Sequence, residues 1–451
     1  MEENDSMSDT RMIALEQSVH AELARLHTSG LADGRHMKER LEPKFAAAGY
    51  RNATTDKLAV PSILVLLIDA IGDTVLTSGF LRELRRSHPR SFIAVLVRPQ
   101  LIPLVAECPY INELIPLAGE RETSDLLAME PVLRERIWPR HFALALSRIW
   151  GPDYRAYRRC LLYLSGARER VDFGDRVFDV YGYPSEPSAT ESLLTQAVLT
   201  PASYTHEAAR IYYMLEAMGC PPQDKSMELW YGTADAVQAG RWLHDLPAGS
   251  LRIVVGIGAG AATRKYPIPQ LSSGLRDIAR RYDVACIIVG GAAEQAEAQQ
   301  LASLLPGINM LNLCGRLSLT ETEAVIAQTD MYIGNDTGVM HMAAAAKKPV
   351  IELSRDPIDK DGVLSPIFSS VCRFAPWQTP YVALRPEHAI GSCREVLVYG
   401  GCVSSVAHCI ATIPPEAIAA AFAALAGQCF ASGDDCYSKT VRQIYVAQHA
   451  R

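Results

Sequence analysis

Short apolar runs separated by small or polar residues divide much of the chain into alternating strands and helices. Residues 62–68 form an almost continuous apolar run, which is typical of a central parallel strand buried on both faces. A helix predicted over 74–87 and a strand over 92–97 complete one β-α-β unit, which implies a right-handed crossover in a doubly wound sheet. A further strand is predicted over 113–117, with helices near 125–137 and 155–165 and a helix over 206–218.

The same alternation begins again after residue 250. Strands are predicted over 252–257, 285–289, 310–313, 331–333 and 349–353, with helices over 271–282, 294–305, 320–328 and 339–346 between them. This pattern predicts a second α/β domain. Because ligands bind outside the carboxyl ends of parallel strands, the loops at these ends are expected to face a cleft between the two domains.

The chain is therefore predicted to have an α/β fold with five segments. Residues 1–60 carry apolar positions at helical spacing and are expected to form a helical extension that either packs on the protein or joins copies of the chain. The first domain is expected over 61–235, a linker over 236–250, the second domain over 251–415, and a C-terminal helix and tail over 416–451.

Composition and charge narrow the classes of protein. The formal net charge of −6 argues against a surface that wraps nucleic acid, and no nucleic-acid partner is expected. No apolar run is long enough to predict a transmembrane helix. The acidic N-terminus lacks a signal-peptide pattern, and the eleven cysteines are mostly isolated, so a reducing, cytoplasmic location is expected.

One loop of the second domain has the pattern of an anion site. Asp336, Thr337 and Gly338 lie between a predicted strand and a predicted helix, where unpaired N–H groups and the helix dipole favour a negative charge. His341 follows Thr337 by four residues, so it lies on the same side of the helix. A capped helix with a half-buried His341 explains the same residues, and both interpretations stay open.

Two further loops are candidates. Thr263 and Lys265 follow the small-residue segment 258–262, which resembles a phosphate-binding turn, although an ordinary turn with a solvated lysine fits equally well. At the end of the first strand, Asp73 follows Gly72 and is expected to face the cleft from the opposite wall. A carboxylate there suits a general base; Asp69 is the alternative base, and helix capping is the structural alternative for Asp73.

Taken together and in order, these motifs resemble glycosyltransferase family 9, the bacterial heptosyltransferases. The resemblance covers about residues 60–420 and is carried by segments 63–89, 108–115, 265–267, 289–291, 312–319 and 334–345. It implies a GT-B architecture of two facing Rossmann-like domains. The chain departs from the family pattern at Leu67, where a basic residue is frequent, at Gly79, where Pro is common, and at Tyr266, where Trp is common.

The resemblance also implies an activity. It implies inverting transfer of a sugar, a heptose from ADP-heptose or a similar nucleotide sugar, to a lipopolysaccharide-core or other glycan or glycolipid acceptor, without a required metal or cofactor. Peripheral contact with the inner face of the inner membrane fits such an acceptor. The implied general base is Asp73, and the implied donor-binding residues are Gly72, Thr263, Lys265, Glu294, Asp336, Thr337, Gly338 and His341.

Four cysteines near the C-terminus leave a second set of alternatives open. None of the spacings between Cys372, Cys393, Cys402 and Cys409 is the two-residue spacing of common zinc sites. This cysteine region resembles that of a subgroup of the family that modifies autotransporter adhesins and binds iron there. A metal site and a protein acceptor therefore stay open beside simple buried thiols.

Two other classes of function remain as alternatives. A GT-B sugar-nucleotide epimerase would need a second carboxylate near the anomeric carbon, which the sequence does not identify. A non-catalytic homologue could use residues 1–60 for docking, although it would have little reason to keep Asp73, Lys265 and His341 together. A nicotinamide-dependent oxidoreductase is disfavoured because no Gly-x-Gly-x-x-Gly follows the first strand.

Overall fold

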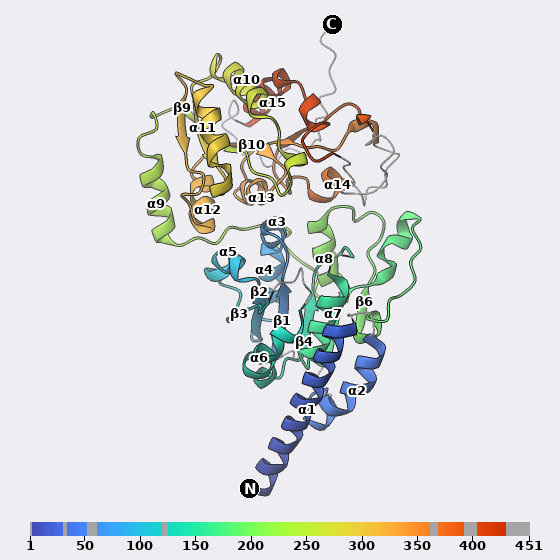
Figure 1. Cartoon of the computed structure of the whole chain (residues 1–451). Helices are drawn as coiled ribbons and strands as arrows, with labels where there is room; N and C mark the ends of the chain where they lie inside the picture. Colours follow the sequence, from blue (N-terminus) through green and yellow to red (C-terminus); the bar gives the residue numbers. More distant parts are fainter. Residues whose placement is uncertain are drawn as a thin grey trace.

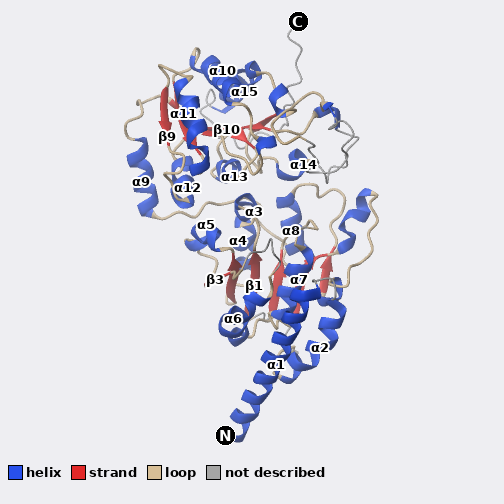
Figure 2. Cartoon of the chain, in the orientation of Figure 1, coloured by secondary structure: helices blue, strands red, loops and turns tan. Residues whose placement is uncertain are grey.

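The computed structural model describes residues 2–29, 34–51, 61–119, 125–152, 154–360, 369–391 and 404–429. Within these ranges the chain forms two α/β domains that face each other, with two N-terminal helices beside the first domain (Figure 1). Each domain has a six-stranded parallel sheet between helices, in the orders β3-β2-β1-β4-β5-β6 and β12-β11-β10-β7-β8-β9 (Figure 2). The predicted pair of doubly wound domains is confirmed.

The first domain contains three strands that the sequence analysis did not predict. Its strands are β1 (Ser62–Leu67), β2 (Phe92–Val97), β3 (Glu113–Pro116), β4 (Leu144–Ser147), β5 (Glu169–Phe173) and β6 (Gln196–Val198). Its helices are α3 (Ile71–Leu76), α4 (Ser78–Ser87), α5 (Ile102–Ala106), α6 (Glu130–Val132), α7 (Arg155–Leu164) and α8 (Glu207–Ala217). β4 and β6 are short, and β5 carries the buried charges of Arg170 and Asp172, which disguise its burial.

Two helix predictions in this domain were wrong in detail. The single helix predicted over 74–87 is divided at Thr77 into α3 and α4. Because α3 begins at Ile71, Asp73 lies in its first turn and is not its N-cap, which is Ala70. The helix predicted near 125–137 consists of short 3-10, α and π turns.

The second domain follows the predicted order and ends with one more strand than expected. Its strands are β7 (Leu251–Gly256), β8 (Val284–Val289), β9 (Asn309–Asn312), β10 (Met331–Asn335), β11 (Val350–Leu353) and β12 (Tyr381–Leu384). Its helices are α10 (Ile268–Ala279), α11 (Gln295–Ser303), α12 (Leu319–Ala327), α13 (Gly338–Ala345), α14 (Ser370–Phe374) and α15 (Pro415–Cys429). The domain boundary predicted after residue 235 falls inside α9 (Thr233–Leu243), which bonds to α12 through Asp235 and Thr320.

The N-terminal extension is helical and covers one face of the first sheet. α1 (Glu2–Ser29) and α2 (Gly34–Ala47) bury apolar residues such as Leu23 and Phe45 in the same core as Leu64 of β1 and Leu161 of α7. The Tyr163 hydroxyl of α7 donates to Glu42 of α2 at 2.7 Å. The packing interpretation of residues 1–60 is thus confirmed for the described part, and joining of copies stays a prediction. Among the described residues, no helix is long and apolar enough to cross a membrane.

Candidate active site

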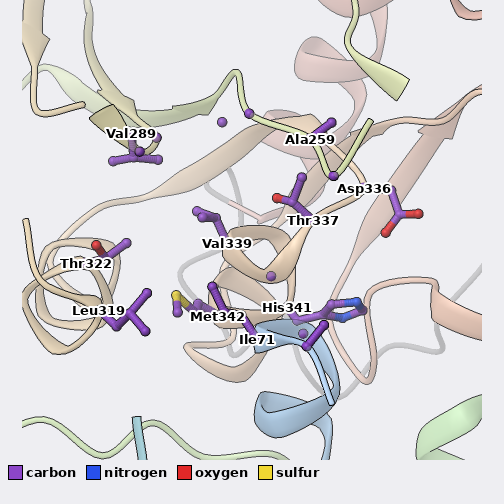
Figure 3. Close-up of a pocket in the computed structure, with 18 of the residues that line it drawn as sticks. Ile71, Ala259, Val289, Leu319, Thr322, Asp336, Thr337, Val339, His341 and Met342 are labelled. Atoms are coloured by element: carbon purple, nitrogen blue, oxygen red, sulfur yellow. The ribbon is translucent and has the colours of Figure 1, made fainter. Parts of the chain in front are cut away.

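A cavity of about 720 Å³ lies between the two domains, at the carboxyl ends of their parallel strands. This is the expected place for a ligand in sheets of this kind, and the volume suits a small-molecule substrate. Figure 3 shows Ile71 and His341 at one side of the cavity and Val289, Leu319 and Thr322 at another. The lining includes Gly72, Asp73, Arg98 and Gln100 from the first domain, and Arg264, Glu294, Asp336, Thr337, Gly338, His341, Met342 and Phe374 from the second.

The two walls touch where two glycines meet. A Cβ atom at Gly72 would lie 2.7 Å from Cδ2 of His341, and a Cβ atom at Gly338 would lie 2.5 Å from Cγ2 of Ile71. Real Cβ atoms do not approach other atoms so closely, so only glycine allows the starts of α3 and α13 to lie this near each other. The loop after β1 and the loop after β10 are therefore two halves of one site.

Asp73 presents a half-buried carboxylate to the cavity from the first turn of α3. The backbone N–H of Ala70 donates to this carboxylate. Burial and the negative charge of Asp69 raise the pKa of Asp73 to about 6, against the lowering effect of Arg148. Asp69 itself is buried, does not line the cavity, and forms an ion pair with Arg148 at 2.7 Å.

The opposite wall is fixed by Asn335, the last residue of β10. Its side-chain amide donates to the carbonyl oxygens of Ile257 and Gly258 at 3.0 and 3.1 Å, and its Oδ1 accepts from the N–H of Tyr266. These bonds tie the loop after β10 to the loop after β7. Thr337, in extended conformation, is the N-cap residue of α13, and the first N–H groups of that helix lie at the cavity.

Asp336 forms an ion pair with Arg264, a residue that was not among the predicted site residues. Nη2 of Arg264 lies 2.5 Å from Oδ2 of Asp336 and donates to the Asp336 carbonyl oxygen at 2.9 Å. Burial raises the pKa of Asp336, and the Arg264 charge acts in the opposite direction. Arg264 and Asp336 both line the cavity, so this pair delivers a guanidinium beside the start of α13.

His341 is a buried neutral imidazole on the cavity wall. Burial and the charge of Arg264 lower its pKa to about 4, so the ring is uncharged at neutral pH. Its Nδ1 atom has no hydrogen-bond partner among the residues that the structure describes. A buried nitrogen without a partner is costly, which points to a ligand group that completes its hydrogen bonding.

Lys265 and Thr263 lie outside the cavity lining. The Lys265 ammonium pairs with Glu294 at 3.1 Å and with Glu297 at 2.8 Å. The Thr263 hydroxyl accepts from Arg355 at 3.3 Å. Glu294 does line the cavity, and its Oε2 accepts from the N–H of Gly291. The structure therefore brings the other predicted site residues together around one cavity, and adds Arg264 to them.

Arg98, Gln100 and Phe374 are lining residues that the sequence analysis also missed. Arg98 follows the apolar run of β2 directly, so the rule that pointed to Asp73 at the end of β1 could have found it. Phe374 comes from α14, which docks on the first domain: Arg373 pairs with Glu207 of α8 at 2.6 Å. No sequence signal connects these distant segments.

Two of the four cysteines in the predicted set lie within the described residues. Cys372 is half-buried and Cys409 is buried, whereas Cys393 and Cys402 lie outside the described residues. Within the described ranges, no group of three or more His, Cys, Asp or Glu residues is arranged to hold a metal ion. The metal alternative therefore stays a prediction.

Comparisons with known proteins point to one family. Residues 230–356 match the sequence model of glycosyltransferase family 9 (heptosyltransferase). Lipopolysaccharide heptosyltransferase 2 of Escherichia coli (strain K12) is 22% identical over 313 residues, covering 64% of this chain and 82% of that protein. Lipopolysaccharide heptosyltransferase 3 of the same strain is 23% identical over 288 residues, covering 62% of this chain and 79% of that protein.

Two solved structures show the same fold. The glycosyltransferase family 9 protein from Veillonella parvula superimposes with a TM-score of 0.61 at 18% identity, covering 83% of this chain and 99% of that one. The E. coli ADP-heptose lps heptosyltransferase II superimposes with a TM-score of 0.56 at 17% identity, covering 81% and 98%. The architecture is GT-B, and the chain is similar to the heptosyltransferases of glycosyltransferase family 9.

Proposed function

We propose that this enzyme transfers a heptose, with inversion, from ADP-heptose or a similar nucleotide sugar to a glycan acceptor of the lipopolysaccharide-core type. The observation that carries the proposal is that Asp73 and the N-terminus of α13 line the same cavity from opposite domains. A base on one wall and an anion site on the other match the two requirements of the reaction. The names of the sequence relatives support a heptosyl group and a lipopolysaccharide acceptor.

In this proposal the diphosphate of the donor binds at the start of α13. The N–H groups of Thr337 and Gly338 are available there, and the helix dipole favours an anion. Arg264 supplies the positive charge, because it lines the cavity and Asp336 orients its guanidinium. The predicted contacts of Lys265 and Thr263 become indirect: Lys265 holds Glu294, and Thr263 holds Arg355.

The nucleoside occupies the other end of the cavity. Val289, Leu317 and Leu319 provide apolar surface for a base, and the Glu294 carboxylate provides acceptors for the ribose hydroxyls. The sugar then lies near His341 and Gly72, where the two domains touch. A hydroxyl of the sugar or a phosphate oxygen would supply the hydrogen bond that Nδ1 of His341 lacks.

Asp73 is the proposed general base, in preference to Asp69. Asp69 is ion-paired and does not line the cavity, whereas Asp73 does. The acceptor oxygen forms a bond to the anomeric carbon as its proton passes to Asp73, and the bond from that carbon to the diphosphate breaks. The negative charge that grows on the leaving group is stabilised by Arg264 and the N–H groups of α13. The proposal includes no metal or other cofactor.

A pKa of about 6 suits this role, since the carboxylate is mostly ionised at neutral pH and is still basic enough to accept a proton. Three carboxylates line the cavity in the described part of the chain, and two of them are ion-paired: Glu294 with Lys265, and Asp336 with Arg264. Asp73 is therefore the carboxylate best suited to proton transfer. This distribution gives no support to an epimerase, which would need a second such group.

The proposal is tested first by donor binding and then by transfer. ADP-heptose is expected to raise the melting temperature of the protein more than UDP-, GDP- or CMP-linked sugars at the same concentration. Transfer from ADP-heptose to a lipopolysaccharide core that lacks heptose is then followed by mass spectrometry. If ADP-heptose neither stabilises the protein nor serves as donor, the assignment of the donor is wrong. Conversion of the donor to an epimer without any acceptor would establish the epimerase alternative.

If the acceptor is carried on a lipid, the enzyme works beside a membrane. We therefore include transient contact with the inner face of the inner membrane in the proposal. Sedimentation with vesicles that contain the acceptor lipid, compared with vesicles that lack it, checks this part. Equal sedimentation with both vesicles would contradict contact through the acceptor.

A further inference from the structure

A buried ion pair lies behind the proposed catalytic base. Asp69 follows β1 by two residues, and Arg148 directly follows β4, the strand next to β1 in the sheet. Asp69 is 6% exposed and Arg148 is 3% exposed, and Nη2 of Arg148 lies 2.7 Å from Oδ2 of Asp69. Both residues therefore follow the carboxyl ends of central strands, where the site lies, although neither lines the cavity.

Stability alone does not explain this pair. Moving two charges out of water costs several kcal/mol for each ion, on the order of what their attraction returns, so apolar residues would serve the core at least as well. The first domain already has other buried pairs of this type, such as Arg158 with Asp172, at 2.8 Å, away from the cavity. The position of the Asp69–Arg148 pair next to Asp73 needs another reason.

Asp73 lies four residues after Asp69, and burial together with the negative charge of Asp69 raises its pKa. Two carboxylates in such a place repel each other, and without compensation one of them takes up a proton. The charged and titratable groups around Asp73 come from both domains: Asp69, Arg98, Arg148 and Glu207 from the first, and Arg264, Asp336 and His341 from the second. Of the charges that act most strongly on Asp73, Arg148 is the positive one.

We propose that the buried Asp69–Arg148 ion pair sets the charge state of Asp73, which makes both of its members positioning residues for the proposed base. Arg148 keeps the two carboxylates ionised together. Asp69 holds the guanidinium away from Asp73, which would otherwise be neutralised by a direct pair and lose its basicity. The opposite effects of Asp69 and Arg148 on the pKa of Asp73 agree with this division of roles. The inference rests on the proposed function, in which Asp73 is the base.

The test measures the pKa of the Asp73 carboxyl group directly. Protein labelled with ¹³C at the aspartate carboxyl carbon is titrated by NMR, and the Asp73 signal is identified by its loss in Asp73→Asn. Arg148→Met keeps the apolar stem and is expected to raise the pKa of Asp73 by about one pH unit, since an opposite charge nearby commonly lowers a carboxyl pKa by that much or more. Asp69→Asn is expected to lower it by a similar amount, because Arg148 then acts on Asp73 alone.

The double variant Asp69→Asn/Arg148→Met is the decisive measurement. Since it removes one charge of each sign, the opposite shifts of the two single variants are expected to cancel, so that the pKa of Asp73 returns to within about half a pH unit of the wild type. A merely structural role of the pair would produce no opposite shifts to cancel. Arg158→Met breaks a buried pair elsewhere in the domain and serves as the control. It is expected to reduce stability without moving the Asp73 titration.

Unchanged titration in Asp69→Asn would overturn the inference. So would a double variant that keeps the shift of either single variant, or an equal shift in the Arg158→Met control. If Arg148→Met does not fold, the other two variants still decide. The test does not depend on the sugar or on turnover. Wild-type transfer by Asp73→Asn would refute the proposed base, whereas absence of the titration shifts would refute only the role of the ion pair.

Discussion

The loop after β1 and the loop after β10 are built in the same way, from a buried central strand, an aspartate, a glycine and the start of a helix. Each glycine contacts the other loop across the cleft. The two aspartates, Asp73 and Asp336, differ in whether they form an ion pair. Asp336 is held at 2.5 Å by Arg264. Asp73 accepts a backbone N–H from Ala70, faces the cavity, and forms no ion pair among the described residues, since the nearby Arg148 pairs with Asp69.

This difference shows that the partner of a carboxylate, rather than its motif, decides what the carboxylate can do. A paired aspartate orients a cation and leaves the N–H groups of its helix to bind an anion. An aspartate in desolvated surroundings with a raised pKa can accept a proton. In the proposed function, these similar patterns serve proton transfer on one wall and donor binding on the other.

The largest expected effect separates the two aspartates. Asp73→Asn is expected to lower kcat by about 10²–10⁴-fold, since a general base contributes this much, while the Kd for ADP stays within about twofold. Asp336→Asn is the matched change on the other wall and is expected to weaken ADP binding instead, because Arg264 loses the carboxylate that orients it. Rates and calorimetric Kd values for the two variants check this. Turnover near the wild-type value in Asp73→Asn would refute the role of Asp73.

The next effect concerns the glycine contact. Gly338→Ala places a methyl group 2.5 Å from Ile71 and 3.2 Å from the backbone nitrogen of Gly72, so the two walls must separate. We expect kcat/KM to fall about 10-fold or more, since a small misplacement of the reacting groups is costly. X-ray scattering is expected to show a more open molecule.

Gly260→Ala is the control for this prediction. Gly260 lines the same cavity, but a Cβ atom there meets nothing within 4 Å. Its activity and scattering profile are expected to match the wild type. If Gly338→Ala is as active and as compact as Gly260→Ala, the contact between the two loops is not needed for transfer.

A smaller effect distinguishes the two adjacent cations. Arg264→Met is expected to weaken donor binding about 10-fold, because a charged hydrogen bond to the diphosphate contributes about 1.5–3 kcal/mol. Lys265→Met is expected to change the donor Kd by about threefold or less, since this ammonium acts through Glu294 and Glu297. Calorimetry with ADP measures both values. A larger loss in Lys265→Met than in Arg264→Met would restore the direct role that the sequence predicted for Lys265.

The titration of His341 is expected to change the stability of the protein at low pH. Its effect on transfer at neutral pH is expected to be the smallest of all. Its pKa is lowered from 6.5 to about 4 in the folded protein, so the unfolded chain binds the proton more readily between these values. Stability is therefore fully present above about pH 6.5 and is lost as the pH falls towards 4, by about 1–2 kcal/mol between pH 7 and pH 5 from this group. Urea unfolding at the two pH values measures the loss.

His341→Gln is expected to make the fall in stability between pH 7 and pH 5 smaller. His244→Gln serves as its control, because the side chain of His244 is 83% exposed. An unchanged pH dependence in His341→Gln would mean that the imidazole is not held neutral by the wall.

Most of the fold was predictable because its central strands are long apolar runs. β1 and β7 were predicted almost to the residue, since burial on both faces leaves no alternation to misread. β5 was missed because Arg170 and Asp172 are buried within it, each with partners supplied by distant segments. Periodicity alone does not reveal such compensation.

The candidate site was predictable as a set of loops but not as a set of side chains. The rule that ligands bind at the carboxyl ends of strands identified both walls of the cavity. It did not decide between Arg264 and Lys265, since a short 3-10 turn over Ala262–Arg264 determines which neighbour faces the cavity. It also could not reveal that Arg148 would pair with Asp69, because that depends on the order of strands in the sheet.

The packing of α1 and α2 on the first sheet has a consequence for how the chain is made. These helices leave the ribosome before α7, on which their buried residues pack: Tyr163 bonds to Glu42 at a separation of 121 residues. At synthesis rates of about 5–20 residues per second, their apolar faces remain exposed for several seconds until α7 has been synthesised. During that interval the exposed apolar faces of α1 and α2 are prone to aggregation.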